Sequence, residues 1–301
     1  MKLTIIGCYS ATPRIVGQTT SQILESRGHV FLIDCGEGTQ LELRRHKVKF
    51  NLIKHIFISH LHGDHYFGLI GLISTFRLLN RDADLHIYGP KGIKEIITIQ
   101  LKKSNSWTNF NLYFHELENS CSELLFEDNR IEVFTIPLDH RIYTNGFLFK
   151  EKPFDRKLLI NEIKANNIDK AYFRKLKQGS DVYNKEGKLI KNSSVTTIGR
   201  KSKSYAFCSD TAYNECILPL IKNVDVLYHE STFLELHKNL CIKTKHSTAK
   251  QAAIIAKKAS ALKLILGHYS SRYTDLQLFK SEASTIFENV LLARDGISFN
   301  F

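Results

Sequence analysis

Three histidines and one aspartate lie within the six residues His60-Leu61-His62-Gly63-Asp64-His65. Imidazole nitrogens and carboxylate oxygens are ligands that zinc accepts at about 2.0 to 2.2 Å. Alternating positions on a tight turn let His60 and His62 face one ion, while Asp64 and His65 face a second. A surface turn that is rich in histidine by chance is the alternative, but clustered ionisable groups need partners. The spacing therefore predicts a metal site.

Further candidate ligands follow apolar strands elsewhere in the chain. The histidine-rich turn itself follows a β-rich run, 54–59, and precedes an apolar, helix-like run, 66–79. Taken alone, a histidine or aspartate after a strand is more often an ordinary loop residue. Sites in layered α/β folds gather where loops leave the strand ends, so distant residues can converge there. Three candidates fit this pattern: His140 after the strand 131–136, Asp210 after 205–208 and His268 after 262–266.

The first third of the chain predicts the elements that support this turn. Strand-like segments cover 2–7, 21–25 and 30–33, and the last two are joined by a hairpin turn at 26–29. The run Asp34-Cys35-Gly36-Glu37-Gly38-Thr39-Gln40 then ends the strand and opens a helix through Arg45. Its glycines permit a sharp turn close under the metal site. We interpret Asp34 and Glu37 as carboxylates that orient metal-binding histidines or cap the helix, rather than as ligands.

Composition and the alternation of elements limit the fold class. With 301 residues and 43% hydrophobic residues, the chain can form one large domain or two small ones. Helical segments at 41–46 and 93–101 alternate with strands at 85–88 and 131–136, which predicts an α/β layered fold. The longest uncharged apolar run is shorter than the roughly 20 residues that span a bilayer. The six cysteines include no Cys-x-x-Cys pair, which fits a reducing cytosol.

Positive charge is concentrated in one segment. The chain carries a net charge of +12, and 15 Lys and Arg against 6 Asp and Glu give +9 between Lys150 and Lys203. The same segment contains the aromatic residues Phe154, Tyr172, Phe173 and Tyr183. A solvated helix face is the ordinary interpretation of such a stretch. Basic residues interleaved with aromatic ones, in an insertion between two ligand-bearing strands, favour nucleic-acid binding instead.

The motifs together resemble a known family. The run from Phe57 to Leu69, FISHLHGDHYFGL, is similar to the signature of ribonuclease Z, the tRNA 3′-processing endonucleases of the metallo-β-lactamase superfamily. The run DCGEGTQ and the contexts PLDH, SDT and LGHYS match that family in sequence and order. The resemblance implies a four-layer αββα fold, a single domain over 1–301, and a protruding basic arm at 150–185 that binds tRNA as an exosite.

The resemblance also assigns roles to individual residues. It implies two Zn²⁺ ions per subunit, which together activate a water for attack on phosphorus. Asp64 is implied as the acceptor of that water's proton, and His246 as the donor to the leaving 3′ oxygen. Glu230 is implied to orient His246 or His229, against the alternative of polar groups satisfied within the core. One zinc is implied to take His60, His62 and His140, the other Asp64, His65 and His268, with Asp210 as the bridge.

The segment around His246 carries a helix-start signal of its own. Thr248 and Gln251 have the spacing of a capping box for a helix through Ala259, which would hold His246 just ahead of that helix. The remaining histidines lack such context, and we interpret them as structural or solvated. They are His29, His46, His55, His86, His115 and His237.

The implied function is a zinc-dependent endoribonuclease that removes the 3′ trailer of precursor tRNA. The cut would follow the discriminator nucleotide and leave a 3′-hydroxyl on the tRNA and a 5′-phosphate on the trailer. The implied protein is a cytoplasmic homodimer without a membrane segment. Two alternatives are a small-molecule hydrolase of the same superfamily (phosphodiesterase, lactonase or β-lactamase) and a non-catalytic RNA-binding subunit. Ligand chemistry alone leaves zinc, manganese and iron in competition.

Overall fold

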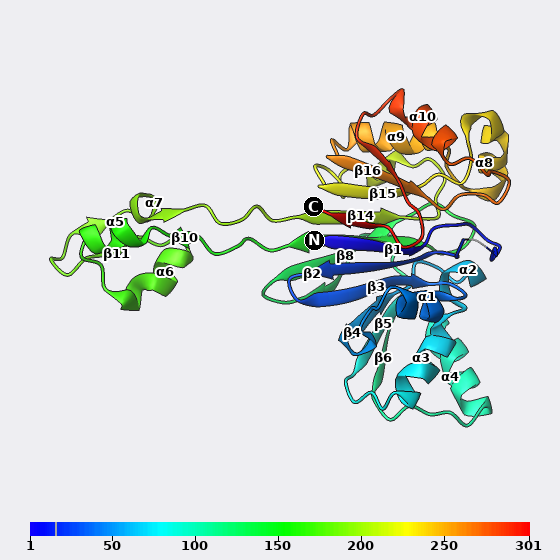
Figure 1. Ribbon diagram of the computed structural model, residues 1–301, viewed down its shortest axis with the longest axis horizontal. Helices are drawn as coiled ribbons and strands as arrows, with labels where there is room; N and C mark the ends of the chain where they lie inside the picture. Colours follow the sequence, from blue (N-terminus) through cyan, green and yellow to red (C-terminus); the bar gives the residue numbers. More distant parts are fainter. Residues whose placement is uncertain (16) are drawn as a thin grey trace. The chain divides into compact units, whose positions relative to one another are not determined.

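Two sheets of seven strands each form the centre of the larger unit of the chain, residues 1–150 and 203–301 (Figure 1). The structure, a computed structural model, describes residues 1–15 and 17–301. The first sheet runs in the order β18 (Ser298–Asn300), β1 (Lys2–Gly7), β2 (Ser21–Ser26), β3 (His29–Cys35), β4 (Ile53–Phe57), β5 (Leu85–Pro90) and β6 (Leu112–Leu117).

The second sheet comes from the middle and the end of the chain. Its order is β17 (Val290–Leu292), β16 (Lys263–Gly267), β15 (Val226–Glu230), β14 (Ser204–Cys208), β9 (Asn145–Glu151), β8 (Ile131–Pro137) and β7 (Leu124–Glu127). Strands β3 to β6 are parallel to one another in the first sheet, and β14 to β17 are parallel in the second. Parallel strands present their carboxyl ends at one edge, which is where the predicted ligands follow.

Helices cover the outer faces of both sheets. On the first sheet these are α1 (Thr39–Arg45), α3 (Leu69–Leu78) and α4 (Ile93–Lys103), and on the second α9 (Ala249–Lys258) and α10 (Gln277–Ser284) (Figure 1). The shorter elements of this unit are α2 (Gly63–Tyr66), α8 (Lys238–Thr244), η1 (Phe50–Leu52), η3 (Glu215–Ile217) and η4 (Glu235–His237). The predicted layered α/β fold is confirmed.

Alternation along the strands explains the layers. In β4 the side chain of Ile56 packs with the helices, whereas its neighbour Phe57 belongs to the core between the sheets. Successive side chains of a strand point to opposite faces, so both faces of this sheet are apolar and both are covered. Phe57 stacks on Tyr88 of β5, with ring centroids 4.7 Å apart. This packing fixes the strand that leads into the histidine-rich turn.

Close backbone approach under the histidine-rich turn requires glycine. A Cβ atom at Gly36 would lie 2.4 Å from the carbonyl oxygen of Asp64, and one at Gly68 would lie 2.2 Å from that of Gly36. Any side chain at these positions would therefore push the Asp34–Gln40 run away from the turn. The sharp turn predicted from the glycines is confirmed. The helix-like run after the turn divides into α2 and α3, with Phe67 and Gly68 between them.

Residues 151–202 form a second compact unit. Its elements are β10 (Lys157–Leu158), α5 (Ile160–Ala165), η2 (Lys170–Tyr172), α6 (Phe173–Lys177), β11 (Val182–Tyr183), β12 (Leu189–Ile190), α7 (Asn192–Val195) and β13 (Thr196–Thr197). Strand β10 pairs with β13, and β11 pairs with β12. Buried Ile163, Leu176 and Val195 belong to a small core of this unit. Residues 186–202 therefore complete its pairing and packing.

None of the helices among the described residues is both long and apolar enough to cross a membrane.

Candidate metal centre

Four predicted ligands form the first group of the candidate centre. One ligand atom from each of His60, His62, His140 and Asp210 lies within 4.8 Å of the others. The Nε2 atom of His60 is 3.0 Å from Nδ1 of His62, and Nε2 of His140 is 3.3 Å from the same Nδ1. Burial lowers the pKa values of His60, His62 and His140, which keeps these imidazoles neutral. Neutral imidazole is the form that binds a metal ion.

The second group consists of Asp64, His65 and His268, whose ligand atoms also lie within 4.8 Å of one another. The Oδ2 atom of Asp64 is 3.5 Å from Nε2 of His65 and 3.5 Å from Nε2 of His268. The same Oδ2 accepts a hydrogen bond of 2.8 Å from the backbone N–H of Ala11. Strands β4 and β16 therefore deliver their loops to one place, as predicted from the sequence.

Asp210 lies between the two groups and turns one oxygen toward each. Its Oδ2 is 3.7 Å from Nε2 of His60 and 4.0 Å from Nε2 of His140. Its Oδ1 is 3.1 Å from Nε2 of His268 and 3.6 Å from Nε2 of His65. A carboxylate in this orientation can contact two cations at once.

Two orphaned nitrogen atoms test whether the residues fit a metal. The Nε2 atoms of His65 and His268 are buried and have no hydrogen-bond partner among residues 1–15 and 17–301. The Nδ1 atom of His65 donates to Oδ2 of Asp34 at 2.7 Å, and Nδ1 of His268 lies 2.9 Å from Oγ1 of Thr232. Each ring therefore turns its Nε2 atom toward Asp64 and Asp210. A cation there would satisfy both nitrogens, so the donor set fits a metal ion.

Asp34 orients the candidate ligand His65, as we predicted from the sequence. Its fully buried carboxylate accepts hydrogen bonds from the backbone N–H of Ser59 at 2.7 Å, from the Ser59 hydroxyl at 2.9 Å and from His65. Outer contacts of this kind fix the orientation and the tautomer of a ligating histidine. Glu37 instead lies exposed at the cavity over the centre.

Replacing Asp34 with asparagine should weaken metal binding by about 10- to 100-fold. The neutral amide oxygen of asparagine is a weaker acceptor than the carboxylate and would hold the His65 ring less firmly. The measurement is a competition titration with a zinc chelator. Glu37→Gln is the matched control and should bind as the wild type does. Equal affinity of the Asp34 variant and the wild type would contradict the assigned role of Asp34.

His246 and Glu230 form a charged pair beside the two groups. The Nδ1 atom of His246 is 2.7 Å from Oε1 of Glu230, which is fully buried. Burial opposes charge on the imidazole, but the carboxylates of Glu230 and Asp210 outweigh it and raise the pKa of His246 to about 9. Glu230 thus contacts His246 with its side chain, whereas His229 donates to the backbone carbonyl of Glu230 at 2.8 Å.

The predicted capping box of Thr248 and Gln251 is confirmed.

Three residues that join these groups carried no signal in the sequence. Thr232 donates from Oγ1 to Oε2 of Glu230 at 2.6 Å and also contacts His268, so it links the charged pair to a candidate ligand. The backbone carbonyl of Lys245 accepts from Nδ1 of His140 at 2.9 Å. Ser59 contacts Asp34. Hydroxyls and carbonyls of this kind are too common in sequences to be singled out without coordinates.

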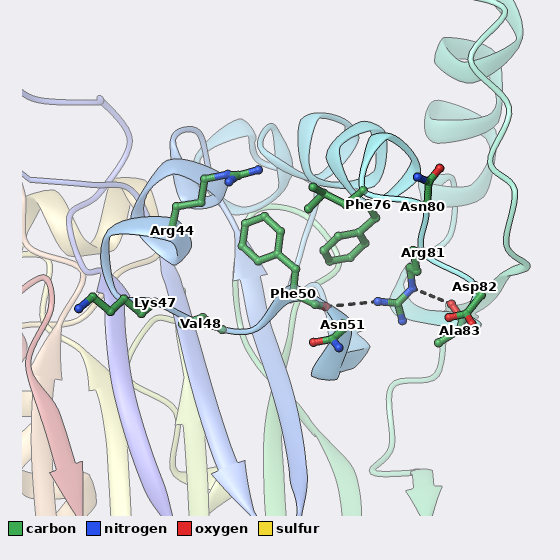
Figure 2. A pocket seen from close by; sticks show the side chains of 11 residues that line it. Arg44, Lys47, Val48, Phe50, Asn51, Phe76, Asn80, Arg81, Asp82 and Ala83 are labelled. Carbon is green, nitrogen blue, oxygen red and sulfur yellow. Dashed lines mark hydrogen bonds between the residues drawn. The ribbon is translucent and has the colours of Figure 1, made fainter.

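A cavity of about 570 Å³ opens over the centre. His62, Asp64, Asp210, His246 and His268 belong to its lining. A larger cavity of about 710 Å³ lies where β4 and β5 begin, away from the strand ends that carry the ligands (Figure 2). There Arg81 donates to the carbonyl oxygens of Phe50, Ala83 and Asp84, so it braces two loops. The chemistry is therefore concentrated in the smaller cavity.

Known structures define the class of the protein. The structure is similar to YhfI from Bacillus subtilis, a metallo-β-lactamase fold protein, with a TM-score of 0.69 and 19% identity over 99% of this chain and 98% of that one. It is also similar to the short form of human tRNase Z, with a TM-score of 0.72 and 26% identity over 100% of this chain and 99% of that one. The protein has the metallo-β-lactamase fold, as its motifs predicted.

Curated relatives define the family. Ribonuclease Z of Cytophaga hutchinsonii is 48% identical over 301 residues, which cover 99% of this chain and 95% of the relative. Ribonuclease Z of Bacteroides thetaiotaomicron is 42% identical over 296 residues, which cover 98% of this chain and 94% of the relative. The chain belongs to the ribonuclease Z family, and its residues 1–154 also belong to the family whose model is described as Anti-Pycsar protein Apyc1.

Proposed function

We propose that the protein is a metal-dependent endoribonuclease that removes the 3′ trailer from precursor tRNA. The cut follows the discriminator nucleotide and leaves a 3′-hydroxyl on the tRNA and a 5′-phosphate on the trailer. The observation that carries this proposal is the convergence of all seven candidate ligands beside the His246–Glu230 pair. Four of these ligands, His62, Asp64, Asp210 and His268, and also His246 line one cavity. Identity of 48% to a ribonuclease Z over 99% of the chain supports the substrate class.

The proposed cofactor is a pair of zinc ions in each subunit. His60, His62 and His140 would hold one ion, Asp64, His65 and His268 the other, and Asp210 would contact both. Two bound metal ions activate a water for attack on phosphorus and neutralise charge on the phosphoryl oxygens. The two-sided orientation of Asp210 supports the number of ions. Zinc is proposed because five of the seven ligands are imidazoles.

Two side chains of the protein are the proposed donor and acceptor of the protons that move in the reaction. The leaving 3′ oxygen needs a proton, and His246 is charged at neutral pH because its pKa is raised to about 9. Glu230 holds the ring by its Nδ1 atom, which leaves Nε2 free to donate toward the substrate. Asp64 is the proposed acceptor of the water's proton. Burial opposes the ionisation of Asp64, but the electrostatic interaction with His65 favours it, and on balance the pKa of Asp64 is lowered, so Asp64 is a weak base and a good ligand.

Replacing Glu230 with glutamine should move the alkaline limb of kcat to lower pH. His246 must be protonated to act as the acid, so kcat falls as pH rises through the pKa of His246. Removing the Glu230 charge lowers that pKa. The check is a pH profile of kcat on precursor tRNA for the wild type and the variant. An alkaline limb at the wild-type position would exclude His246 as the acid held by Glu230.

We further propose that residues 1–301 form one domain in which the segment 150–185 is an inserted tRNA-binding arm. Residues 186–202 complete the same compact unit, so we propose that they belong to the arm as well. Residues 151–202 carry 13 Lys and Arg against 6 Asp and Glu, a net charge of +7. Neutralising phosphates with such charges releases counterions, so this unit would supply sequence-independent affinity for RNA. Tyr183 is 56% exposed and offers a ring for base stacking.

The proposed setting is a homodimer in the cytoplasm. All six cysteines are free in the described part of the chain, and Cys121 and Cys216 are exposed, which suits a reducing compartment. Sedimentation at several protein concentrations tests the dimer. A mass of one chain throughout, beside full activity, would overturn it.

Incubation of the purified protein with a 3′-extended precursor tRNA, followed by sequencing of both product ends, tests the proposed function. We expect one cut after the discriminator nucleotide. Hydrolysis of a chromogenic diester or a lactone without tRNA cleavage would favour a small-molecule hydrolase. Binding of the precursor with no turnover of any substrate would favour a non-catalytic RNA-binding subunit.

A further inference from the structure

An exposed aromatic ring lies at the edge of the candidate metal centre. Phe67 is 59% exposed and belongs to the lining of the 570 Å³ cavity, together with His62 and Asp64. It follows the candidate ligand His65 by two positions and comes directly after the short helix α2. A large apolar ring in water contributes little to folding, because the benefit of apolar side chains comes from area removed from water. Its position next to the ligands points to a role in binding.

The ring is held in place from one side. A Cβ atom at Gly63 would lie 2.2 Å from Cε2 of Phe67, so the ring rests directly on the Gly63 backbone. Tyr66 meets it edge-on, with ring centroids 5.0 Å apart. These contacts hold one side of the ring, while the side chain stays exposed and lines the cavity. A ligand would therefore meet a preorganised apolar surface rather than a mobile side chain.

The other phenylalanine of the cavity differs from Phe67. Phe233 is only 6% exposed, and the guanidinium of Arg272 covers its ring at 5.5 Å. Phe67 is thus the open aromatic surface of this cavity within the described residues. Arg141 also lines the cavity and forms no ion pair among those residues, so a phosphate could approach it. The Phe67 ring could contact a base and the Arg141 guanidinium could contact a phosphate, so the two side chains together match a nucleotide chain.

We propose that Phe67 stacks on the base of a nucleotide next to the scissile phosphate. This inference rests on the proposed function, since it takes RNA as the substrate of the same cavity. Every nucleobase presents a flat π face, so stacking holds a single-stranded nucleotide without selecting its sequence. The candidate ligands would hold metal ions that bind the phosphate, and Phe67 would hold the adjoining base, so the RNA chain would have one position relative to the centre. Phe67 is thus a substrate-positioning contact of the cleavage site.

A double-mutant cycle between the enzyme and its substrate tests the proposal. Phe67→Leu removes the π surface and keeps an apolar side chain on Gly63, and Phe67→Tyr keeps the ring. The substrates are a precursor tRNA and two copies of it that lack the base on one side or the other of the cut. The measurement is kcat/KM for each pair. Trp107→Leu, at a ring that is 51% exposed outside the cavity lining, is the matched control.

We expect Phe67→Leu to lower kcat/KM by on the order of 10-fold on the intact precursor, mainly through KM. One base-less substrate should show the same loss with the wild type and no further loss with the leucine variant, since the two changes remove one contact. Trp107→Leu should keep the wild-type kcat/KM, and Phe67→Tyr, which keeps the π surface, should lose less kcat/KM than Phe67→Leu does. Melting temperature and zinc content verify that Phe67→Leu is folded and loaded.

Two results would overturn the proposal while leaving the proposed function intact. One is a wild-type kcat/KM for Phe67→Leu, and the other is independent, multiplying losses with both base-less substrates. A wild type that fails to cut the intact precursor would overturn the proposed function and this inference together.

Discussion

The His62→Ala variant should lose precursor tRNA cleavage by at least about 10³-fold while it keeps the wild-type affinity for tRNA. His62 belongs to the first candidate metal group, with its Nδ1 atom 3.0 Å from Nε2 of His60 and 3.3 Å from Nε2 of His140. A bound ion supplies several kcal/mol of stabilisation to the charge of the transition state, and each 1.36 kcal/mol is tenfold in rate. Phosphate contacts outside the centre set most of the affinity.

Single-turnover cleavage and a filter-binding titration measure the two quantities separately. His115→Ala is the matched control, because His115 is exposed on β6, outside both metal groups. It should cleave and bind as the wild type does. Equal losses of cleavage and affinity in His62→Ala would contradict the separation of chemistry from binding.

Removal of the compact unit 151–202 should abolish tRNA cleavage and spare the hydrolysis of a small phosphodiester. The unit has its own core and its own strand pairs, β10 with β13 and β11 with β12, so the cuts belong outside these pairs. A deletion that stops at 185 would break both pairs, because β12 and β13 follow it. A short Gly-Ser linker should therefore replace residues 153–200.

The reason for the large loss is the charge of this unit, which is +7 within a chain of +12. Fewer neutralised phosphates release fewer counterions, so the salt dependence of the remaining tRNA affinity should also become shallower. Kd measured at several salt concentrations gives this slope. Full tRNA cleavage without the unit would show that the arm is not needed for tRNA recognition. Loss of both activities would indicate a damaged metal centre.

Local patterns in the sequence predicted most of the fold and brought the seven candidate ligands to attention. The strand before His60, the strands before His140, Asp210 and His268, and the capping box of Thr248 are visible because each is a run of a few neighbouring residues. Parallel strands deliver their following loops to one edge of a sheet, so strand ends were a sound guide to convergence.

What the sequence could not predict depends on the direction of single side chains. Nothing distinguishes Thr232 from other threonines until its Oγ1 is found between Glu230 and His268. The sequence also could not tell whether His246 or His229 is the partner of Glu230, because either ring could reach this carboxylate. The coordinates show that His246 contacts it and that His229 contacts the backbone carbonyl instead. The end of the basic unit is set by strand pairs in which each strand has two residues. Strands this short show no recognisable alternation of apolar and polar residues in the sequence.

We propose that seven side chains from distant parts of the chain hold two zinc ions side by side. An anomalous difference map from crystals of the protein as purified, recorded at the zinc edge, tests it most directly. We expect two peaks, one among His60, His62 and His140 and one among Asp64, His65 and His268, with an Asp210 oxygen at each. A single peak, or peaks outside these residues, would contradict a two-zinc centre at these side chains.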